Sequence, residues 1–449
     1  MQSLKVLLIV LAAFLISGAA GAEEAPIHFS KNDRVLVVSP HPDDEMLGTG
    51  GVMLSALEAG ADVKVIYLTH GDYNEIASIF FQKKLLLTTA DFIKSGQVRK
   101  KEAISAMSVL GLAEKDLIFF GYPDLGTLGI WRGHWGQTKP FRSVITRINK
   151  VPYKDDFSYG WPYRGDNVVR DFEKIFSSVK PTHIFVTPPF DLNPDHRAAY
   201  LYVNAALLNL EGKIEKPNVF AYLIHAHRWP TPRKYKLTEP LKPPGAIQAD
   251  THLQWLSYDL TPRQMELKRN ALLKYTSQAA YSRNFMLSFV RTNELFLRLP
   301  YENLNASPTN AVSDQQKAGK RSAPEKVTYW IQGDEFWVDV RDTSPLGELG
   351  AMTIEIFSYK NGVEFPTLPK LNLRLLGSRI FVRDGRRRVL GSGIQYDLGK
   401  KTLVIRVPLK LLKSPDYLFV SAQILRNDIS LDFGSWRILK VNKDQTSFP

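Results

Sequence analysis

The feature that most constrains the fold is an alternation, between residues 34 and 277, of short apolar runs with stretches of helical spacing. The first run, Arg34–Ser39, is rich in β-branched residues, and the stretch after it, Glu45–Gly60, ends at a glycine as helices often do. This alternation favours an α/β fold with a mostly parallel sheet and helices on both faces. The other predicted strands are Asp62–Thr69, Leu117–Gly121, His183–Thr187 and Val219–His225, and the other predicted helices are Val98–Leu110, Asn167–Val179, His196–Leu210 and Pro262–Ser277.

A change of pattern after residue 302 indicates a second domain. Residues 303–325 are polar, small and proline-containing, which is typical of a linker. Beyond them, apolar and polar residues alternate between turn signals, so we predict an α/β domain over residues 23–302 and an all-β sandwich over residues 326–449. The predicted strands of the sandwich are Thr328–Val340, Met352–Tyr359, Leu371–Val382, Thr402–Pro408 and Tyr417–Ile424.

Residues 1–22 have the features of a secretory signal peptide. Lys5 precedes an apolar stretch, Val6–Ile16, and small residues follow up to Ala22 in a typical cleavage pattern. An uncleaved membrane anchor is the alternative, but the apolar stretch is short for one. We therefore expect an exported protein, periplasmic or extracellular, with no stable membrane span after signal cleavage.

Charge and cysteine content exclude several kinds of site. The formal net charge of the 449-residue chain is +13, yet its longest basic block is residues 386–388, so the charge is spread out and argues against a nucleic-acid partner. The chain contains no cysteine, which excludes disulfides and thiolate metal sites. Any bound metal must be held by His, Asp and Glu side chains.

The strongest local motif is Pro40–Glu45, directly after the first predicted strand, at the sheet edge where α/β proteins place their sites. His41 and Asp44, three residues apart on a strand-to-helix turn, can converge on one ion, while Asp43 points elsewhere but stays close. One carboxylate for a metal and one for proton transfer suit metal-assisted hydrolysis. The alternative, helix capping by the two aspartates, does not account for the preceding His-Pro.

A second motif, Asp191–Arg197, follows the fourth predicted strand. If the first and fourth strands are neighbours, the two turns face each other across the sheet edge. His196 would then complete a site of two histidines and one carboxylate, with an open position for water. The alternative is a helix N-cap turn with an incidental histidine.

Together, the His41–Asp44 run and the later Asp195–Ala198 run resemble the PIG-L/LmbE-like family of zinc-dependent N-acetylglucosaminyl deacetylases. Weaker similarities extend the resemblance over residues 30–290. It implies a Rossmann-like fold, one Zn²⁺ per chain bound by His41, Asp44 and His196, and Asp43 as the general base. Other divalent ions also suit such a ligand set. The weaker segments are Arg99–Gly111, Phe120–Asp124 and Lys268–Gln278.

One position departs from the family pattern: Asn193 stands where many members carry a histidine that donates a proton or contacts the oxyanion. An asparagine cannot exchange a proton, although its amide can donate a hydrogen bond. Either Asp43 both accepts and returns the proton, or another histidine substitutes. His225 after the fifth strand and His70 after the second are the candidates, whereas we expect His183 to be structural.

Further candidates lie near strand ends and in a long insertion. Asp72, Arg99 and Asp124 either bind sugar hydroxyls or orient the ligands, or they form salt bridges behind the site. The long insertions are residues 72–97 and 126–166; the aromatic and basic residues of the second form either a polymer-binding lid or a self-packed unit. They are Trp131, Arg132, His134, Trp135, Tyr153, Phe157, Trp161 and Tyr163.

The sandwich, with Trp330, Trp337 and Trp436, loosely resembles carbohydrate-binding modules, and a structural or partner-binding role is the alternative. We expect a secreted metal-dependent amidase that de-N-acetylates an N-acetylhexosamine unit of a polysaccharide or glycoconjugate. Two alternatives stay open. One is a carbohydrate-binding protein whose hydrolase domain is impaired, which Asn193 keeps in play. The other is a deacylase of a non-polymeric N-acyl amino sugar conjugate.

Overall fold

The computed structural model describes most of the chain. The signal-peptide prediction falls on residues 1–22 and lies outside the described part. Among the helices that are described, none has the length and apolar character needed to cross a membrane. The described residues are 27–73, 87–245, 253–304, 312–315, 326–342, 345–346, 351–377, 379–385, 387–389, 393–426, 429–430 and 436–442.

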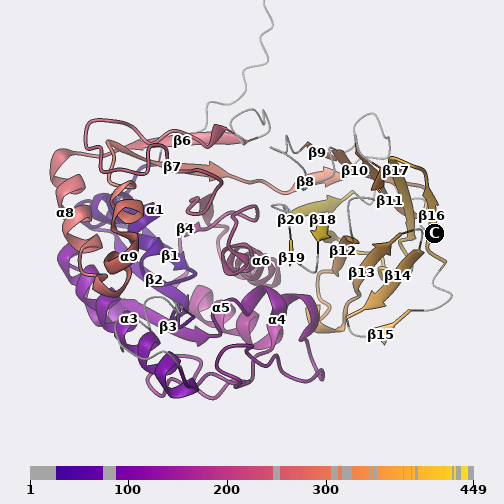
Figure 1. Ribbon diagram of the computed structural model, residues 1–449, viewed down its shortest axis with the longest axis horizontal. Coiled ribbons are helices and arrows are strands. Elements are labelled where there is room, and N and C mark those ends of the chain that lie inside the picture. Colours follow the sequence, from indigo (N-terminus) through magenta and orange to yellow (C-terminus); the bar gives the residue numbers. More distant parts are fainter. Residues whose placement is uncertain are drawn as a thin grey trace, which may run out of the picture.

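A seven-stranded sheet in the order β3-β2-β1-β4-β5-β7-β6 forms the centre of the α/β domain (Figure 1). The first five strands in this order are parallel, and the last two pair antiparallel. Because β1 pairs with both β2 and β4, the carboxyl end of β1 is the point where the strand order reverses, which is where such sheets place their sites. The strands are β1 (Arg34–Ser39), β2 (Asp62–Thr69), β3 (Leu117–Tyr122), β4 (His183–Val186), β5 (Asn218–Ala221), β6 (Gln254–Asp259) and β7 (Asn293–Arg298).

Helices cover both faces of this sheet, which confirms the predicted layered α/β fold. Strand β1 shows why its apolar run is continuous: Leu36 and Val38 enter the core beneath α5 and α6, whereas Val35 and Val37 enter the core beneath α1 and α3. The helices are α1 (Asp44–Glu58), α3 (Thr89–Leu110), α4 (Thr127–Gly133), α5 (Gly165–Val179), α6 (Pro194–Asn209), α8 (Pro262–Leu272) and α9 (Thr276–Leu287).

Three element predictions need correction. The insertion predicted over residues 72–97 is shorter, because α3 begins at Thr89, where Thr88 and Asp91 form a reciprocal capping box. The helix predicted over residues 262–277 is split into α8 and α9. Strand β5 ends at Ala221 rather than at residue 225, and the extended chain beyond it accepts a hydrogen bond from Leu192.

The C-terminal domain is a sandwich of a five-stranded sheet, β16-β17-β11-β10-β9, and an eight-stranded sheet that follows the path β15-β14-β13-β12-β18-β20-β8, with β19 beside β18. Side chains from both sheets share one core, for example Ile331 and Val338 with Ile354 and Leu373. The strands are β8 (Glu302–Leu304), β9 (Val312–Gln315), β10 (Lys326–Gln332), β11 (Glu335–Arg341), β12 (Ala351–Tyr359), β13 (Lys370–Leu376), β14 (Arg379–Asp384), β15 (Arg387–Arg388), β16 (Gln395–Leu398), β17 (Thr402–Pro408), β18 (Tyr417–Arg426), β19 (Ile429–Ser430) and β20 (Trp436–Val441).

The sandwich differs from its prediction at three places. The stretches predicted as single strands over residues 328–340 and 371–382 are each hairpins, β10–β11 and β13–β14. The linker predicted over residues 303–325 is wrong in part: β8 reaches residue 304 and pairs with β20, and β9 pairs with β10. β8 also contributes to the core of the sandwich, because Leu304 is 1% exposed.

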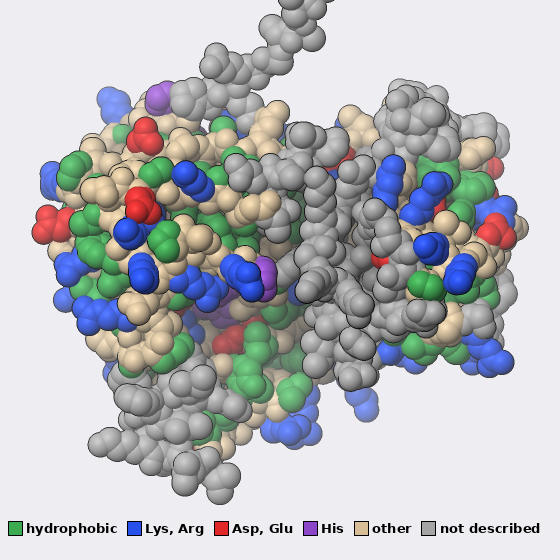
Figure 2. Space-filling view, turned by 45° about the horizontal axis from the view of Figure 1, so that its top comes forward, with side chains coloured by type: hydrophobic (Ala, Val, Ile, Leu, Met, Phe, Trp, Pro, Cys, Tyr) green, Lys and Arg blue, Asp and Glu red, His purple; other side chains and the backbone are tan. Residues whose placement is uncertain are grey.

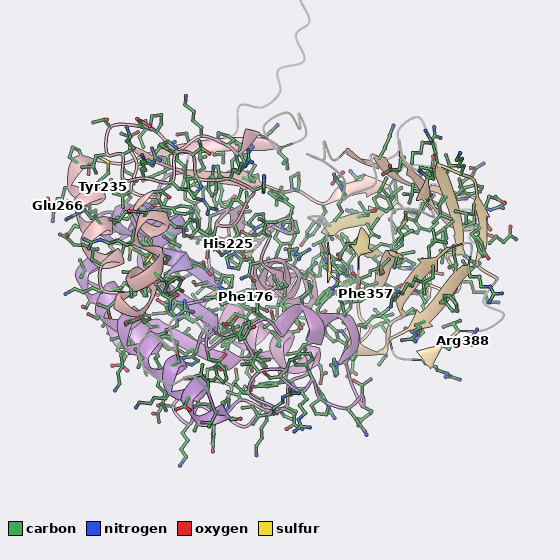
Figure 3. All side chains as sticks on the ribbon, viewed as in Figure 1. Phe176, His225, Tyr235, Glu266, Phe357 and Arg388 are labelled. Atoms are coloured by element: carbon green, nitrogen blue, oxygen red, sulfur yellow. The ribbon has the colours of Figure 1, made fainter. Side chains whose placement is uncertain are left out.

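The two domains share a continuous hydrophobic core rich in aromatic rings, and we call its part around Trp131, Phe357, Phe365, Phe419 and Trp436 the seam. Figure 3 labels Phe357 on the side of the sandwich that faces the α/β domain. Trp131 of α4 lies 5.8 Å from Phe357 and 5.3 Å from Phe419 between ring centroids. The lid interpretation is therefore wrong for the buried aromatic residues of the insertion, and carbohydrate contact is wrong for Trp436, which is 1% exposed. The insertion residues concerned are Trp131, Trp135, Tyr153 and Tyr163.

Candidate metal centre

Two turns at the carboxyl ends of β1 and β4 form the site. The first turn, residues 40–43, is held to the end of β2 because the backbone N–H and the hydroxyl of Thr69 both donate to the Pro40 carbonyl at 3.0 Å. The second turn leads into α6, whose N-cap is Asn193. Pairing of β1 with β4 brings the two turns together, as the sequence predicted.

Three buried side chains from these turns converge. Asp44 Oδ2 lies 3.0 Å from His41 Nδ1 and 2.9 Å from His196 Nε2, and the two histidine nitrogens are 3.2 Å apart. Two imidazole nitrogens and one carboxylate oxygen within this distance of one another can hold a divalent cation. The predicted ligands His41, Asp44 and His196 are therefore in one place.

Other carboxylates contact the far nitrogens of the same histidines. His41 Nε2 lies 3.1 Å from Asp124 Oδ1 and 3.3 Å from Asp195 Oδ2, and His196 Nδ1 lies 3.3 Å from Asp191 Oδ2. Carboxylates in this position fix the tautomer and ring orientation of metal-binding histidines. The sequence placed Asp191 and Asp195 in the second motif but gave them no role, because only the tertiary structure aims them at the rings.

His41 and two of these carboxylates, Asp124 and Asp195, form a second group that could hold an ion. Asp195 already accepts hydrogen bonds from the backbone N–H groups of Leu125 (2.5 Å) and Thr127 (3.0 Å) and from the Thr127 hydroxyl (2.5 Å). Because the Asp195 carboxylate already accepts these three hydrogen bonds, it is suited to orienting the His41 ring. We therefore assign the ion to the group of His41, Asp44 and His196.

The charges of the site call for a cation. Burial alone would lower the pKa of His196, but the carboxylates of Asp191 and Asp44 outweigh it and raise the pKa to about 9. Burial would likewise lower the pKa of His41, but the Asp124 carboxylate outweighs it, and the pKa is raised well above its ordinary value. Carboxylates that draw protons onto both imidazoles would equally stabilise a divalent ion between them.

Asp43, the predicted general base, lies beside this group. Its backbone has φ 121°, a conformation that costs energy for any residue with a Cβ and occurs mostly where function requires it. Burial raises the pKa of its carboxyl to about 8, against the opposing charge of Arg99, whose Nη2 lies 3.4 Å away. Arg99 is fixed by donating to the carbonyls of Pro42 (2.6 Å) and Gly71 (2.7 Å).

A cleft of about 280 Å³ opens onto these groups. Figure 2 shows a hollow in the α/β domain with histidine and acidic side chains inside it and hydrophobic side chains at its edge. One wall is formed by α9 and the floor by the two turns. The lining residues are His41, Asp43, Asp44, Leu47, Tyr73, Arg99, Asp124, Leu125, Asn193, His225, Gln278, Tyr281, Ser282, Phe285 and Met286.

Asn193, which stands in place of the family histidine, and His225, one of the two histidines considered as its substitute, both line the cleft. Asn193 Oδ1 accepts from the Asp195 N–H at 2.8 Å, so any contact of Asn193 with substrate would use its side-chain N–H groups. The His225 ring lies 4.8 Å from that of His196 and stacks on Phe285 (Figure 3). Burial lowers the pKa of His225 to about 4, which keeps its imidazole neutral.

The remaining candidates lie away from the cleft. Asp72 does not line it, and its carboxylate accepts from the Tyr153 hydroxyl at 2.8 Å, which corrects the predicted contact with substrate. The His70 ring is buried, and its Nε2 lies 2.5 Å from Asp156 Oδ2 in the second insertion. His70 therefore does not take the place of the family histidine that Asn193 replaces. His183, at the opposite end of β4, is structural as predicted, 3.5 Å from Asp33.

Comparison with known proteins supports the family resemblance. Residues 36–207, from β1 into α6, match the family described as PIG-L: GlcNAc-PI de-N-acetylase. This stretch contains His41, Asp43, Asp44 and His196, and the resemblance indicated by the two motifs is confirmed over it.

The curated relatives are also named as deacetylases. A 1D-myo-inositol 2-acetamido-2-deoxy-alpha-D-glucopyranoside deacetylase of Corynebacterium glutamicum is 30% identical over 183 residues, which cover 39% of the chain and 54% of the relative. A protein of the same name from Rhodococcus erythropolis is 27% identical over 209 residues, covering 45% and 60%. The chain thus spans about half the length of the curated relatives it matches.

Among solved structures, the N,N'-diacetylchitobiose deacetylase of Pyrococcus horikoshii is 19% identical, with 58% of this chain and 82% of that chain covered and a TM-score of 0.35. A similarity of this size carries no conclusion about substrate.

Proposed function

We propose that the chain is an exported, zinc-dependent amidase that removes the acetyl group from an N-acetylhexosamine unit of a glycoconjugate or polysaccharide. The observation that carries the proposal is the convergence of His41, Asp44 and His196 on one point of a cleft, with Asp43 beside them. The family match over residues 36–207 and the names of the curated relatives support an acetamido sugar as the substrate class.

His41, Asp44 and His196 would hold the zinc ion, which when bound supplies an activated water and polarises the acetyl carbonyl. Asp43 then accepts the proton of the attacking water. Because the Asp43 carboxyl lines the cleft beside the three proposed ligands, it is also placed to return that proton to the departing amine. Arg99 holds Asp43 in place and balances its charge.

A second polar group at the reacting carbonyl would come from Asn193 or His225, which also line the cleft. Asn193 can donate a hydrogen bond to a developing oxyanion but cannot transfer a proton. His225 is neutral near pH 7, and so it too would act as a hydrogen-bonding group rather than as a cationic acid. Asp43 would therefore transfer the proton, and Asn193 or His225 would stabilise the negative charge on the oxyanion.

The α9 wall suits a sugar ring. Tyr281 and Phe285, on either side of a kink in α9 at Ser282, both line the cleft, and aromatic faces stack on the apolar faces of sugars. A cleft of about 280 Å³ fits a single sugar unit with its acetamido group rather than a long chain segment. The curated relatives act, by their names, on a small inositol conjugate, which favours a non-polymeric glycoconjugate as the second candidate substrate.

An acetate-release screen tests the proposal. The panel holds N-acetylglucosamine oligomers, acetylated envelope polysaccharides and an N-acetylglucosaminyl-inositol, each with and without chelator, and Asp43→Asn serves as the inactive control. We expect chelator-sensitive release from at least one of these substrates. Binding of the sugars without any release of acetate would instead support an impaired, carbohydrate-binding protein.

Export is tested separately. When the full gene is expressed with its own N-terminus, we expect the mature protein to begin at Glu23 and to be found outside the cytoplasm. An intact N-terminus on a cytoplasmic product would contradict this part of the proposal.

A further inference from the structure

The short helix α4 (Thr127–Gly133) connects the metal centre to the sandwich domain. At its first residue, the backbone N–H and hydroxyl of Thr127 bind Asp195, and Leu125 just before the helix binds the same carboxylate. Asp195 in turn lies 3.3 Å from His41 Nε2. The beginning of α4 therefore holds a group that orients a proposed metal ligand.

The end of the same helix is fixed in the sandwich. Arg132 donates to both carboxylate oxygens of Glu355, from Nε at 2.9 Å and from Nη2 at 2.8 Å, and its Nη2 also reaches Gln423 Oε1 at 2.9 Å. Glu355 and Gln423 are each 1% exposed, whereas the Arg132 side chain is 34% exposed, so this is a partly buried, two-point contact whose acceptors are fixed in the sandwich. Trp131 packs beside it in the seam among Phe357, Phe419 and their neighbours.

A second contact runs from the sandwich to the other turn of the site. The Trp436 N–H at the start of β20 donates to the Pro189 carbonyl at 3.2 Å. Two residues on, Asp191 accepts from the N–H groups of Ile224 (3.1 Å) and His225 (2.9 Å), and its Oδ2 lies 3.3 Å from His196 Nδ1. Asp191, which faces His196, thus lies two residues from a carbonyl that the sandwich contacts, and Asp195, which faces His41, is held by the first turn of α4.

We propose that the sandwich domain is a positioning part of the metal centre, acting through Arg132 and α4 on Asp195 and His41. The inference rests on the proposed function for the identity of the ligands. It gives the sandwich a role other than carbohydrate binding. A helix of seven residues is short and stiff, so a shift of its last turn moves its first turn as well. Arg132 is accordingly a positioning residue for the deacetylation reaction.

The experiment compares full-length variants loaded with Co²⁺, whose visible absorption reports ligand geometry. Arg132→Ala removes the link to Glu355, Arg132→Lys keeps the charge but not the two-point contact, and Glu355→Gln keeps the shape. Asp397→Asn is the matched control, because it breaks an Arg–carboxylate pair of 2.8 Å with Arg406 on the five-stranded sheet, away from α4. The readouts are the Co²⁺ spectrum, metal affinity, melting temperature, kcat and KM.

We expect Arg132→Ala to weaken metal affinity and lower kcat by about tenfold, at the lower end of the range for groups behind metal ligands, with little change in KM and an altered Co²⁺ spectrum. The metal affinity and kcat of Arg132→Lys and Glu355→Gln should lie between those of the wild type and Arg132→Ala. Asp397→Asn should match the wild type in both quantities and in its Co²⁺ spectrum. If Arg132→Ala does not fold, the graded effect of Glu355→Gln on the spectrum decides.

A lower melting temperature with unchanged spectrum, metal affinity and kcat would overturn the inference and reduce the sandwich to a stabilising domain. Failure of the proposed function is distinguishable: the wild type would then release no acetate from any substrate. The Co²⁺ spectrum and metal affinity would still decide whether Arg132 positions the ligands.

Discussion

The two ends of α4 lie in two different kinds of core. Its first turn contacts a buried cluster of carboxylates and histidines, and its last turn contacts the aromatic seam. Apolar rings that pack edge to face stabilise one another and the domain interface. Buried carboxylates such as Asp44, Asp191 and Asp195 cost desolvation energy and are retained where chemistry requires them.

The comparison teaches that burial alone does not identify function in this molecule. The polar cluster combines a strained backbone at Asp43, shifted carboxyl and imidazole pKa values and access to the cleft, whereas Trp131 and the rings packed on it in the seam line no part of that cleft. Substitutions in the two clusters should therefore have different effects. Those in the polar cluster should abolish catalysis, and those in the seam should lower the free energy of unfolding.

The largest effect is expected at the polar cluster. Asp43→Asn removes the group that accepts the proton, and kcat should fall by on the order of 10²–10⁴. Because Asp43 is not one of the three proposed ligands, metal content measured by elemental analysis should stay at the wild-type level. A variant that lost its metal while remaining folded would show that Asp43 is a ligand instead.

In the seam, Trp131→Ala should act on stability. The indole is fully buried among rings of both domains, so the free energy of unfolding should fall by about 3–5 kcal/mol, as for other large aromatic truncations. Denaturant unfolding of full-length protein measures this. If the free energy of unfolding fell by less than about 1 kcal/mol, packing in the seam would contribute little to the stability of the two domains.

A smaller effect, dependent on pH, is expected at the edge of the seam. Burial lowers the pKa of Lys370 to about 7, although its ammonium contacts the carbonyls of Phe365 and Leu368. The unfolded chain, with an ordinary lysine pKa, binds this proton more tightly between pH 7 and about pH 10.4, so stability should rise with pH across that window.

Lys370→Met should flatten this rise, and at pH 7 it should be more stable than wild type by on the order of 1 kcal/mol. Unfolding measured between pH 6 and pH 10 tests the slope, with the exposed Lys274→Met as control. An identical slope in the wild type and Lys370→Met would show that the carbonyls and the neighbouring rings keep the lysine charged without cost.

The smallest effect is expected at the surface of the insertion. Phe157 is 43% exposed and lies outside the cleft-lining set, so Phe157→Ala should change stability by less than about 0.5 kcal/mol and leave kcat and KM unchanged. A large rise in KM on polymeric substrate alone would restore part of the lid interpretation for this residue.

The sequence was most informative where chemistry is local. His41 and Asp44 share one turn, and His196 was expected beside them on the condition that the first and fourth strands are neighbours, which the structure meets. One feature was visible in the sequence but missed, the capping pair Thr88 and Asp91 that begins α3.

Other features could not be predicted from composition. Trp131 in an aromatic insertion is equally compatible with a lid and with an interface, and only the docked sandwich decides between them. The roles of Asp191 and Asp195 depend on distances across the site, which residue spacing does not encode. Asp72 looked like a site residue because it follows β2, but its side chain turns to Tyr153.

The most direct test of the central claim is a zinc titration of the chelated, full-length wild type, with acetate release followed on the best substrate of the screen. The account predicts no release without metal, recovery that reaches a plateau at one zinc per chain, and no recovery for His196→Ala. Release at the full rate from protein shown by elemental analysis to be metal-free would contradict it.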